Sequence, residues 1–212
     1  MPLQNRVDPF GAIHAVAARG LFTGNRGVIH DPATKTLLSR RWTTKAWIVC
    51  DCAFGDRRRE VMGKNSRSGG ASWTELFFLD EVTALAAGHR PCFYCRREQA
   101  LDFARCFAGG EGRATAPEMD ARLHRERRAS GGAAVALELV QLPILPEGTM
   151  VESAGSAYAL RGARLLPWTF TGYAAPRGMT GLSGPFTLIT PPSTVSALAN
   201  GYRPVWHESA RS

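Results

Sequence analysis

Two cysteines separated by two residues, Cys92 and Cys95, are the sharpest chemical signal in the sequence. Pro91 fixes the entry to a tight turn, and a helix is expected to begin at the second cysteine. In this arrangement both thiolates can point at one tetrahedral ion, as they do in structural zinc sites. Because a structural zinc needs four ligands, two more must come from elsewhere in the chain.

The upstream cysteines Cys50 and Cys52 stand two residues apart on a predicted strand. Alternate residues of a strand face the same side of a sheet, so both thiols can approach one ion. We predict that Cys50, Cys92 and Cys95 bind zinc, and Cys52 is the favoured fourth ligand. A histidine is the next choice, and the candidates are His14, His30, His89 and His124. The alternative is that the strand cysteines are buried thiols and that the later pair is redox-active or has no chemical role.

A second group of residues suits phosphodiester hydrolysis. Asp120 and His124 are four residues apart on a predicted helix, where a carboxylate and an imidazole can hold a divalent ion or position water. His30 lies in the segment GNRGVIHD, whose glycines let the backbone approach a ligand closely. A metal-assisted nuclease that uses His30, Asp120 and His124 with a second divalent ion, magnesium or manganese, is therefore an alternative function. The competing interpretation is an exposed ion pair on a charged helix.

The chain is strongly basic, with 26 lysines and arginines against 18 acidic residues and a formal net charge of +8. This balance favours a polyanionic partner, and we expect nucleic acid, with DNA favoured. The arginines predicted to bind phosphate are Arg40, Arg41, Arg57, Arg58, Arg59, Arg90, Arg96 and Arg97. The aromatic residues available to stack on an unpaired base are Trp42, Trp47, Trp73 and Tyr94. The alternative is that these arginines are solvated and pair with neighbouring carboxylates.

The elements that must position these residues alternate between strands and helices. Apolar runs rich in β-branched and aromatic residues predict strands at residues 13–17, 42–54 and 75–80. Apolar periodicity predicts helices at residues 81–87, 95–107 and 118–128, and Thr115 with Glu118 has the spacing of a capping box before the third of them. From residue 133 onward, short apolar runs spaced by glycine and proline predict a small β-sheet, which a helix at residues 193–200 follows.

We therefore predict an α+β protein in which a zinc-stabilised N-terminal part packs against a small C-terminal sheet. The predicted regions are a strand and helix region with the zinc site at residues 1–110, a connecting helix at 111–132 and a β-rich region at 133–212. A single compact domain is the alternative, since 212 residues with 44% hydrophobic side chains can bury one good core.

No apolar run approaches the ~20 residues of a membrane span, and the N-terminus lacks the pattern of a secretory signal. We expect a cytoplasmic protein without a membrane partner, with association with the nucleoid as an option. In that compartment five cysteines suit metal binding better than disulfides. Cys106, on the apolar stripe of its helix, is expected in the core.

A ten-residue pattern occurs twice, as VTALAAGHRP at residues 82–91 and as VSALANGYRP at residues 195–204. We expect both copies to form a short helix, a glycine stop and a turn. After the second copy, Val205 stands where the first has Cys92, so the turn itself does not need the cysteines.

Residues 75–98, ELFFLDEVTALAAGHRPCFYCRRE, resemble the second half of the Ada-type metal-binding domain, which repairs methylphosphotriesters in DNA. The resemblance implies that a strand and a short helix present Cys92 and Cys95 as two of four zinc ligands, and it implies contact with DNA. In that family an upstream Cys-x3-Cys pair supplies the other two, one being the methyl acceptor. Here Cys50 and Cys52 are closer together, so we expect the zinc scaffold and the DNA contact rather than methyl transfer. The whole chain also resembles uncharacterised bacterial proteins, and this resemblance points to no particular activity.

These observations favour a zinc-containing nucleic-acid-binding protein that acts on DNA in repair or processing. The first alternative is the metal-assisted nuclease with a separate structural zinc. The second is a non-catalytic protein-interaction module whose positive charge meets an acidic protein. The sequence contains no GxSxG, Walker, HExxH or GxGxxG motif, so those hydrolase and nucleotide-binding classes have no support.

Overall fold

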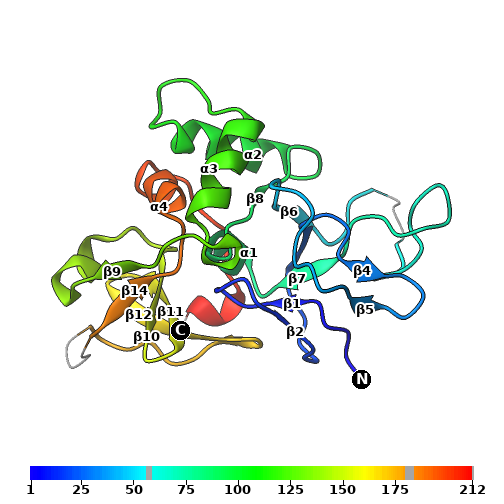
Figure 1. The fold of residues 1–212 in the computed structure, drawn as a ribbon. Helices are drawn as coiled ribbons and strands as arrows, with labels where there is room; N and C mark the ends of the chain where they lie inside the picture. Colours follow the sequence, from blue (N-terminus) through cyan, green and yellow to red (C-terminus); the bar gives the residue numbers. More distant parts are fainter. Residues whose placement is uncertain (56–58, 180–183, 212) are drawn as a thin grey trace.

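The structure is a computed structural model that describes residues 1–55, 59–179 and 184–211, and it shows an α+β protein with two six-stranded sheets (Figure 1). The first sheet has the order β2-β1-β7-β3-β6-β8 and mixes parallel and antiparallel pairs. Its strands are β1 (Arg6–Val7), β2 (Ile13–His14), β3 (Phe22–Asn25), β6 (Ile48–Asp51), β7 (Leu76–Phe78) and β8 (Arg90–Pro91).

The second sheet has the order β13-β12-β11-β10-β14-β9, and every pair in it is antiparallel. Its strands are β9 (Val135–Leu137), β10 (Met150–Ser153), β11 (Ser156–Arg161), β12 (Arg164–Thr169), β13 (Gly172–Tyr173) and β14 (Phe186–Leu188). A separate hairpin joins β4 (His30–Asp31) and β5 (Thr36–Leu37). All six strands of the second sheet lie between residues 135 and 188.

The α-helices are α1 (Glu81–Ala86), α2 (Arg97–Phe107), α3 (Ala116–Glu126) and α4 (Pro192–Ala199), and short 3-10 helices lie at Arg128–Ser130, Leu139–Ile144 and Glu208–Arg211. Thr115 and Glu118 form the predicted capping box of α3. Helices α2, α3 and α4 pack together beside the two sheets (Figure 1), and Cys106 lies in their apolar core, as expected. None of the helices in the described part of the chain has the length and apolar character needed to cross a membrane.

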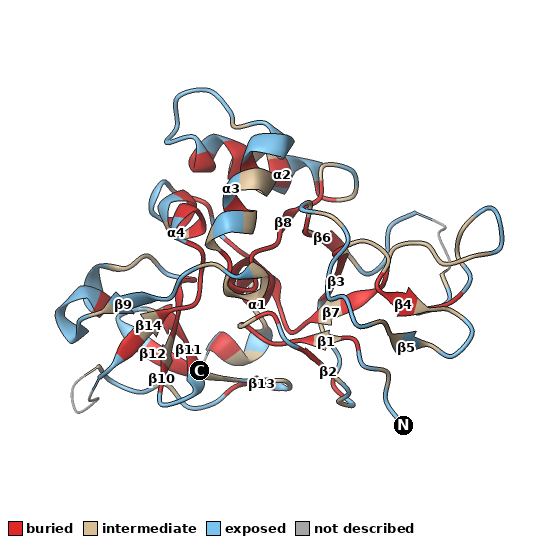
Figure 2. Cartoon of the chain, in the orientation of Figure 1, coloured by how far each residue is buried: buried red, intermediate tan, exposed pale blue. Residues whose placement is uncertain are grey.

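Helix α1 is the centre of the molecule, and all six of its residues are buried (Figure 2). Val82 packs in the core of the second sheet, Ala84 in that of the first, and Leu85 among the other helices. Apolar packing thus crosses from the predicted N-terminal region into residues 133–212. The predicted division of the chain into regions stays a prediction.

Both copies of the repeated pattern end their helix in the same way. Gly88 and Gly201 adopt positive φ angles of 81° and 104°, and each amide donates to a carbonyl three residues back. The next amide, of His89 or Tyr202, donates to a carbonyl five residues back. This pair of bonds is the Schellman ending that glycine favours. In the first copy only, the chain continues as β8 and reaches Cys92.

Two predicted strands are shorter in the structure. Of residues 13–17 only Ile13–His14 form a strand, and of residues 42–54 only Ile48–Asp51 do. The residues before β6 form a loop because the Thr43 amide donates to the Arg26 carbonyl at 2.8 Å, which ties that segment to another part of the chain. At its other end β6 stops at Asp51, so Cys52 lies just beyond the strand.

His89 is completely buried. Its Nε2 accepts a hydrogen bond from Arg26 Nε at 3.3 Å, and its ring packs against Trp47 and Phe78. Burial, followed by the nearby charges of Arg26 and Arg127, lowers the pKa of His89 well below its usual value of 6.5. The folded protein therefore keeps this imidazole neutral.

The free energy of unfolding is expected to fall as the pH drops below about 6.5, because the unfolded chain then binds a proton at His89 and the folded chain does not. This group contributes a slope of up to about 1.4 kcal/mol per pH unit. Urea unfolding between about pH 7 and about pH 5 measures it. In His89→Gln the pH dependence should be weaker, whatever the loss of stability at neutral pH. If stability depends on pH equally in the wild type and in His89→Gln, other groups cause that dependence.

Candidate metal centre

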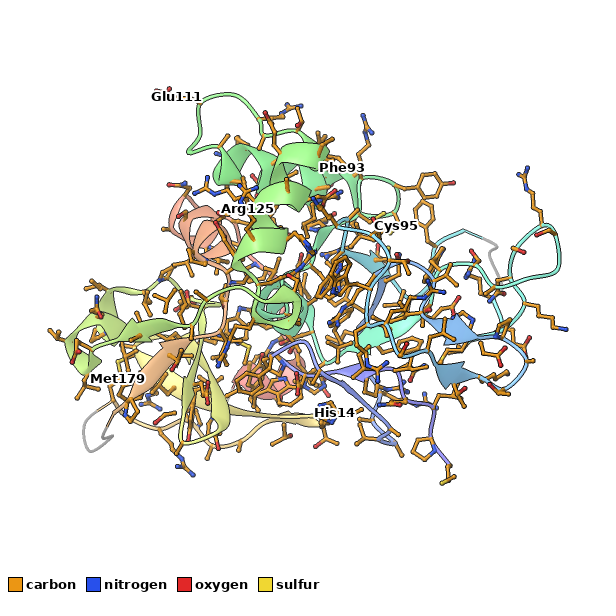
Figure 3. The ribbon with its side chains drawn as sticks, viewed as in Figure 1. His14, Phe93, Cys95, Glu111, Arg125 and Met179 are labelled. Atoms are coloured by element: carbon orange, nitrogen blue, oxygen red, sulfur yellow. The ribbon has the colours of Figure 1, made fainter. Side chains whose placement is uncertain are left out.

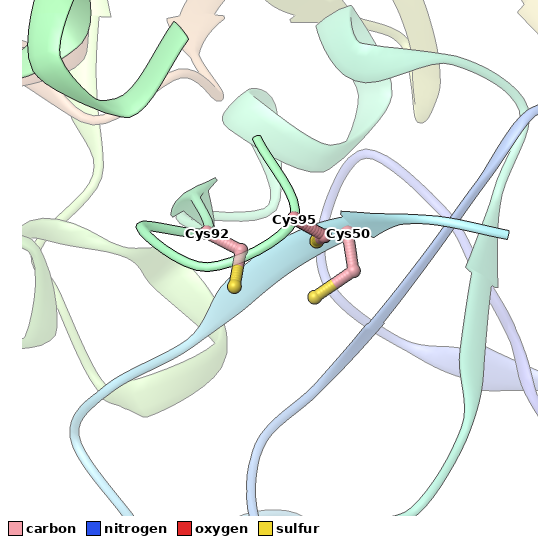
Figure 4. Close-up of side chains that lie close together, drawn as sticks. All are labelled: Cys50, Cys92 and Cys95. Atoms are coloured by element: carbon pink, nitrogen blue, oxygen red, sulfur yellow. The ribbon is translucent and has the colours of Figure 1, made fainter. Parts of the chain in front are cut away.

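Three cysteine sulfurs meet at the edge of the first sheet (Figure 4). Cys50 belongs to β6, while Cys92 and Cys95 lie in the turn between β8 and α2. The three Sγ atoms lie within 4.8 Å of one another, so together they can hold a metal ion. Within the described ranges this is the only group of three or more histidine, cysteine or acidic side chains that are this close. We refer to it as the cysteine triad.

Parallel pairing of β6 with β8 brings the triad together. Val49 is the register partner of Pro91, and the Cys92 amide donates to the Val49 carbonyl at 3.0 Å. Cys92 thereby comes beside Cys50, its neighbour on the adjacent strand. The tight turn is closed by the Arg96 amide, which donates to the Cys92 carbonyl at 3.0 Å. The sequence shows the CxxC motif directly, whereas the pairing of β6 with β8 is seen only in the structure.

The triad concentrates negative charge on one sulfur. Hydrogen bonds from the thiols of Cys50 and Cys95, and then from backbone amides, lower the pKa of Cys92. The Tyr94 amide lies 3.4 Å from that sulfur. The hydrogen bond between the Cys50 and Cys92 side chains is the largest cause that raises the pKa of Cys50. The hydrogen bond with Cys95 and the burial of the thiol raise it further. A bound cation relieves this competition, since it stabilises all three thiolates together.

Cys52, the favoured fourth ligand, lies outside the triad. Its side chain is exposed, and its thiol donates to the Leu21 carbonyl at 3.4 Å. The strand β6 ends at Asp51 and the chain bends at residue 52, where the Leu21 carbonyl rather than the triad holds the thiol. The structure thus brings together three of the four predicted cysteines.

The four histidines named as alternative ligands also have other partners. His14 lies 2.7 Å from an Asp8 oxygen and is well separated from Cys95 (Figure 3). His89 is bonded to Arg26 in the core. The remaining two, His30 and His124, are described with the predicted catalytic residues below.

A cleft of about 770 Å³ opens beside the triad, and all three cysteines line it. This volume falls in the range of small-molecule sites. Its aromatic lining residues are Phe54, Trp73, Phe77 and Tyr94. Its polar lining residues include Thr23, Asn25, Asp51, Arg59 and Glu75. Cys52 lies on the same cleft without joining the triad.

The floor of the cleft is one face of the first sheet. Thr23 of β3 is the register partner of both Phe77 on β7 and Cys50 on β6, so the three side chains form one row across the sheet. No motif in the sequence marks Thr23, Phe77 or Phe54 as a site residue. Cross-strand rows join residues that are far apart in the chain, and no single-strand pattern reveals them.

Two aromatic residues at the cleft have ring contacts of their own. Tyr94 is 62% exposed and meets Phe54 in an edge-to-face pair with centroids 5.1 Å apart. Trp73 lies beneath the guanidinium of Arg59, whose carbon is 4.2 Å from the ring centroid. Both Trp73 and Tyr94 were predicted as stacking residues, and the structure places them at the same cleft.

The other two predicted stacking residues lie elsewhere. Trp47 is buried between the guanidinium groups of Arg26 and Arg127, at 3.9 and 3.6 Å from its ring. It is a core residue and cannot stack on a base. Trp42 packs edge-on against His124 with centroids 4.7 Å apart.

Three of the predicted phosphate-binding arginines instead pair with carboxylates of the chain. Arg90 donates to both oxygens of Asp120, at 2.7 and 2.8 Å, and both side chains are largely buried. Arg59 Nε donates to Glu75 at 2.7 Å. The third is Arg96. Phosphate binding by these three stays a prediction, and it carries a cost, since a guanidinium held by a carboxylate must break that pair before it can bind phosphate.

Arg96 belongs to a buried polar network around α1. Its two terminal nitrogens donate to the two oxygens of Glu81, at 2.7 and 2.9 Å. Its Nε lies 3.3 Å from Asp51. Glu81 also accepts hydrogen bonds from the Tyr202 hydroxyl at 2.6 Å and from the Val205 amide at 2.9 Å. The network joins β6, α1, the cysteine turn and the C-terminal segment.

The remaining predicted arginines divide into two groups. Arg40, Arg41 and Arg97 are exposed, and among the described residues none of them has a carboxylate partner. Arg97 begins α2, two residues after Cys95. Arg57 and Arg58 lie outside the described residues.

The three predicted catalytic residues do not form a site. His30 is buried, with its Nδ1 2.7 Å from the Thr74 hydroxyl. Asp120 is occupied by the arginine described above, and His124 Nδ1 accepts from Arg127 at 2.8 Å. The predicted contact between Asp120 and His124 is therefore replaced by an arginine partner for each. These three side chains form no close ligand group in the part of the chain that the structure describes.

Comparison with models of protein families, with curated proteins and with solved structures gives no match. The resemblance of residues 75–98 to the Ada-type domain stays a prediction.

Proposed function

We propose that this protein is a zinc protein that binds nucleic acid, with DNA favoured, at the cleft beside the cysteine triad, and that it acts in DNA repair or processing. The observation that carries the proposal is the position of three convergent thiols on the wall of a cleft lined by aromatic rings. The proposal needs a metal at the triad and a strand that presents bases to the cleft.

The donor set supports zinc. Thiolates are soft ligands that suit zinc, copper(I) or iron–sulfur clusters, and they are poor ligands for magnesium or calcium. A CxxC turn together with a third cysteine on a neighbouring strand matches the ligand spacing of tetrahedral zinc sites. Bound zinc would fix the turn between β8 and α2 against β6.

The net charge and the cleft support nucleic acid as the partner. The formal charge of +8 attracts a polyanion, and Arg97 lies exposed close to the cysteine turn. Tyr94 and Trp73 offer ring surfaces at the cleft, where an unpaired base can stack. Because Arg59, Arg90 and Arg96 are held in internal ion pairs, base stacking is expected to contribute more to binding than phosphate contacts do. We therefore expect a preference for single strands.

Tyr94→Ala is expected to weaken binding of a single-stranded oligonucleotide by about 5- to 140-fold, which corresponds to the ~1–3 kcal/mol of one base–aromatic stack. Fluorescence anisotropy at fixed salt measures the dissociation constant. Tyr94→Phe is the matched control, because it keeps the ring and should bind like the wild type. Duplex DNA of the same sequence should bind more weakly and respond less to the substitution.

The result also separates the alternatives. Wild-type protein that binds no oligonucleotide even at low salt contradicts the proposal and favours the protein-interaction alternative, in which an acidic protein is the partner. The nuclease alternative gains no support from the structure, because His30, Asp120 and His124 each have other partners.

A further inference from the structure

We infer that the metal at the cysteine triad has only three protein ligands and that its fourth coordination position opens into the cleft, where a neutral ring with a nitrogen or carbonyl donor binds it directly. This inference rests on the proposed metal binding, and it adds an exchangeable ligand site to it. A closed four-ligand zinc is structural, whereas a zinc with three protein ligands keeps a position for water or substrate.

The residues near the triad leave that position free of protein donors. Cys52 is bonded to the Leu21 carbonyl. Asp51 lies 3.3 Å from Arg96 Nε. Neither residue joins the close group of Cys50, Cys92 and Cys95, and no further ligand-type side chain among the described residues does so.

Glu75, the other carboxylate at the cleft, is also occupied. Its Oε1 accepts from Arg59 Nε at 2.7 Å, and its Oε2 accepts from the Met62 amide at 2.8 Å. Both oxygens therefore already accept hydrogen bonds from the chain. A metal at the triad must complete its coordination with water or with a molecule in the cleft.

The charges around the cleft select a neutral ligand. A divalent ion with three thiolates carries one net negative charge, and the carboxylates of Asp51 and Glu75 line the same cleft. Arg59, the one cationic side chain among the described lining residues, is already paired with Glu75. An anion would enter against this field, whereas a neutral donor would not.

The walls of the cleft select a flat ligand. Trp73, Phe77, Phe54 and Tyr94 line it, and rings of this kind stack on planar heteroaromatic molecules. The volume of about 770 Å³ accommodates a small molecule of this class beside the metal. A nucleobase belongs to the same class, as does a free heteroaromatic compound. When such a ligand binds, its donor atom gives a lone pair to the metal and the bound water leaves.

Cobalt-substituted protein tests the inference, because the absorption bands of cobalt(II) report its coordination. Imidazole, a neutral planar nitrogen donor, is titrated against full-length protein that holds one cobalt per chain. We expect a saturable shift of the visible bands at unchanged cobalt content. Azide, a small anion, should need at least a tenfold higher concentration for a comparable shift.

Two variants keep the test specific. Val61 lines the cleft without belonging to the triad, so Val61→Trp should retain cobalt and lose the imidazole response by at least tenfold. Cys52→Ser should keep both the spectrum and the response of the wild type. A full response in Val61→Trp would show that imidazole does not reach the metal through the cleft, and this overturns the inference.

The remaining outcomes separate the inference from the proposed function. One cobalt per chain with bands that imidazole does not move means a closed site, and it overturns the inference alone. A changed spectrum in Cys52→Ser identifies Cys52 as a fourth ligand, and this also overturns the inference alone. Tighter binding of azide than of imidazole refutes the neutral ligand class. Failure to bind cobalt or zinc at all overturns the proposed function as well.

Discussion

Cys92→Ser is expected to reduce the zinc content from about one ion per chain to nearly none, and to lower the melting temperature at the same time. Cys92 is the sulfur on which the other two thiols and the turn amides converge. A serine hydroxyl stays protonated at neutral pH and is a poor zinc ligand, so two thiolates remain. Elemental analysis and thermal unfolding of the same preparations measure both effects.

The expected loss of stability follows from linkage between binding and folding. Free zinc at 1,000 times its dissociation constant stabilises the folded state by about 4 kcal/mol. For a chain of this length that corresponds to a melting-temperature shift on the order of 10 °C. The shift should depend on the zinc concentration in the wild type and not in the variant.

Two cysteines outside the triad provide the controls. Cys52→Ser removes an exposed thiol on the cleft and should leave the zinc content unchanged. Cys106→Ser places a hydroxyl in the helical core, so it lowers the melting temperature without a loss of zinc. If Cys92→Ser retains one zinc per chain, the triad is not the metal site and the proposed function fails.

The parts of this site that the sequence predicts are those governed by local rules. The CxxC turn, the capping box at Thr115 and the glycine stops each depend on a few consecutive residues, and the structure has them where the sequence predicts them. Cys50 could be named as a ligand because it is a cysteine on a predicted strand. Its nearness to Cys92 depends on the pairing of β6 with β8, which no local pattern encodes.

The arginines show why the surroundings of the site could not be predicted from the sequence. Arg90 and Arg96 flank the cysteine turn, and sequence alone presents them as a basic cluster. Their carboxylate partners, Asp120 and Glu81, lie 30 and 15 residues away in the chain. Tertiary packing places each guanidinium against an acid and removes it from the surface. A charge cluster in sequence therefore overstates the phosphate-binding surface of a folded chain.

Arg96→Met is expected to lower the free energy of unfolding by about 3–5 kcal/mol, because it leaves the Glu81 carboxylate buried without its cation. The side chains of Arg96 and Glu81 are 3% and 0% exposed, and both terminal guanidinium nitrogens donate to the two carboxylate oxygens. The Arg96 guanidinium also stacks over the Phe22 ring at 4.4 Å. Urea unfolding at neutral pH measures the effect.

A double variant distinguishes an unpaired charge from lost packing. If the buried carboxylate causes the loss, adding Glu81→Gln to Arg96→Met should recover at least about 1 kcal/mol, since the amide is neutral. The exposed pair of Arg105 and Asp102 is the matched control, and Arg105→Met should cost much less than Arg96→Met because solvent screens that pair. Equal losses from Arg96→Met and Arg105→Met would contradict the role of the buried pair. Because Arg96 directly follows Cys95, zinc affinity should weaken together with stability in Arg96→Met and recover in the double variant.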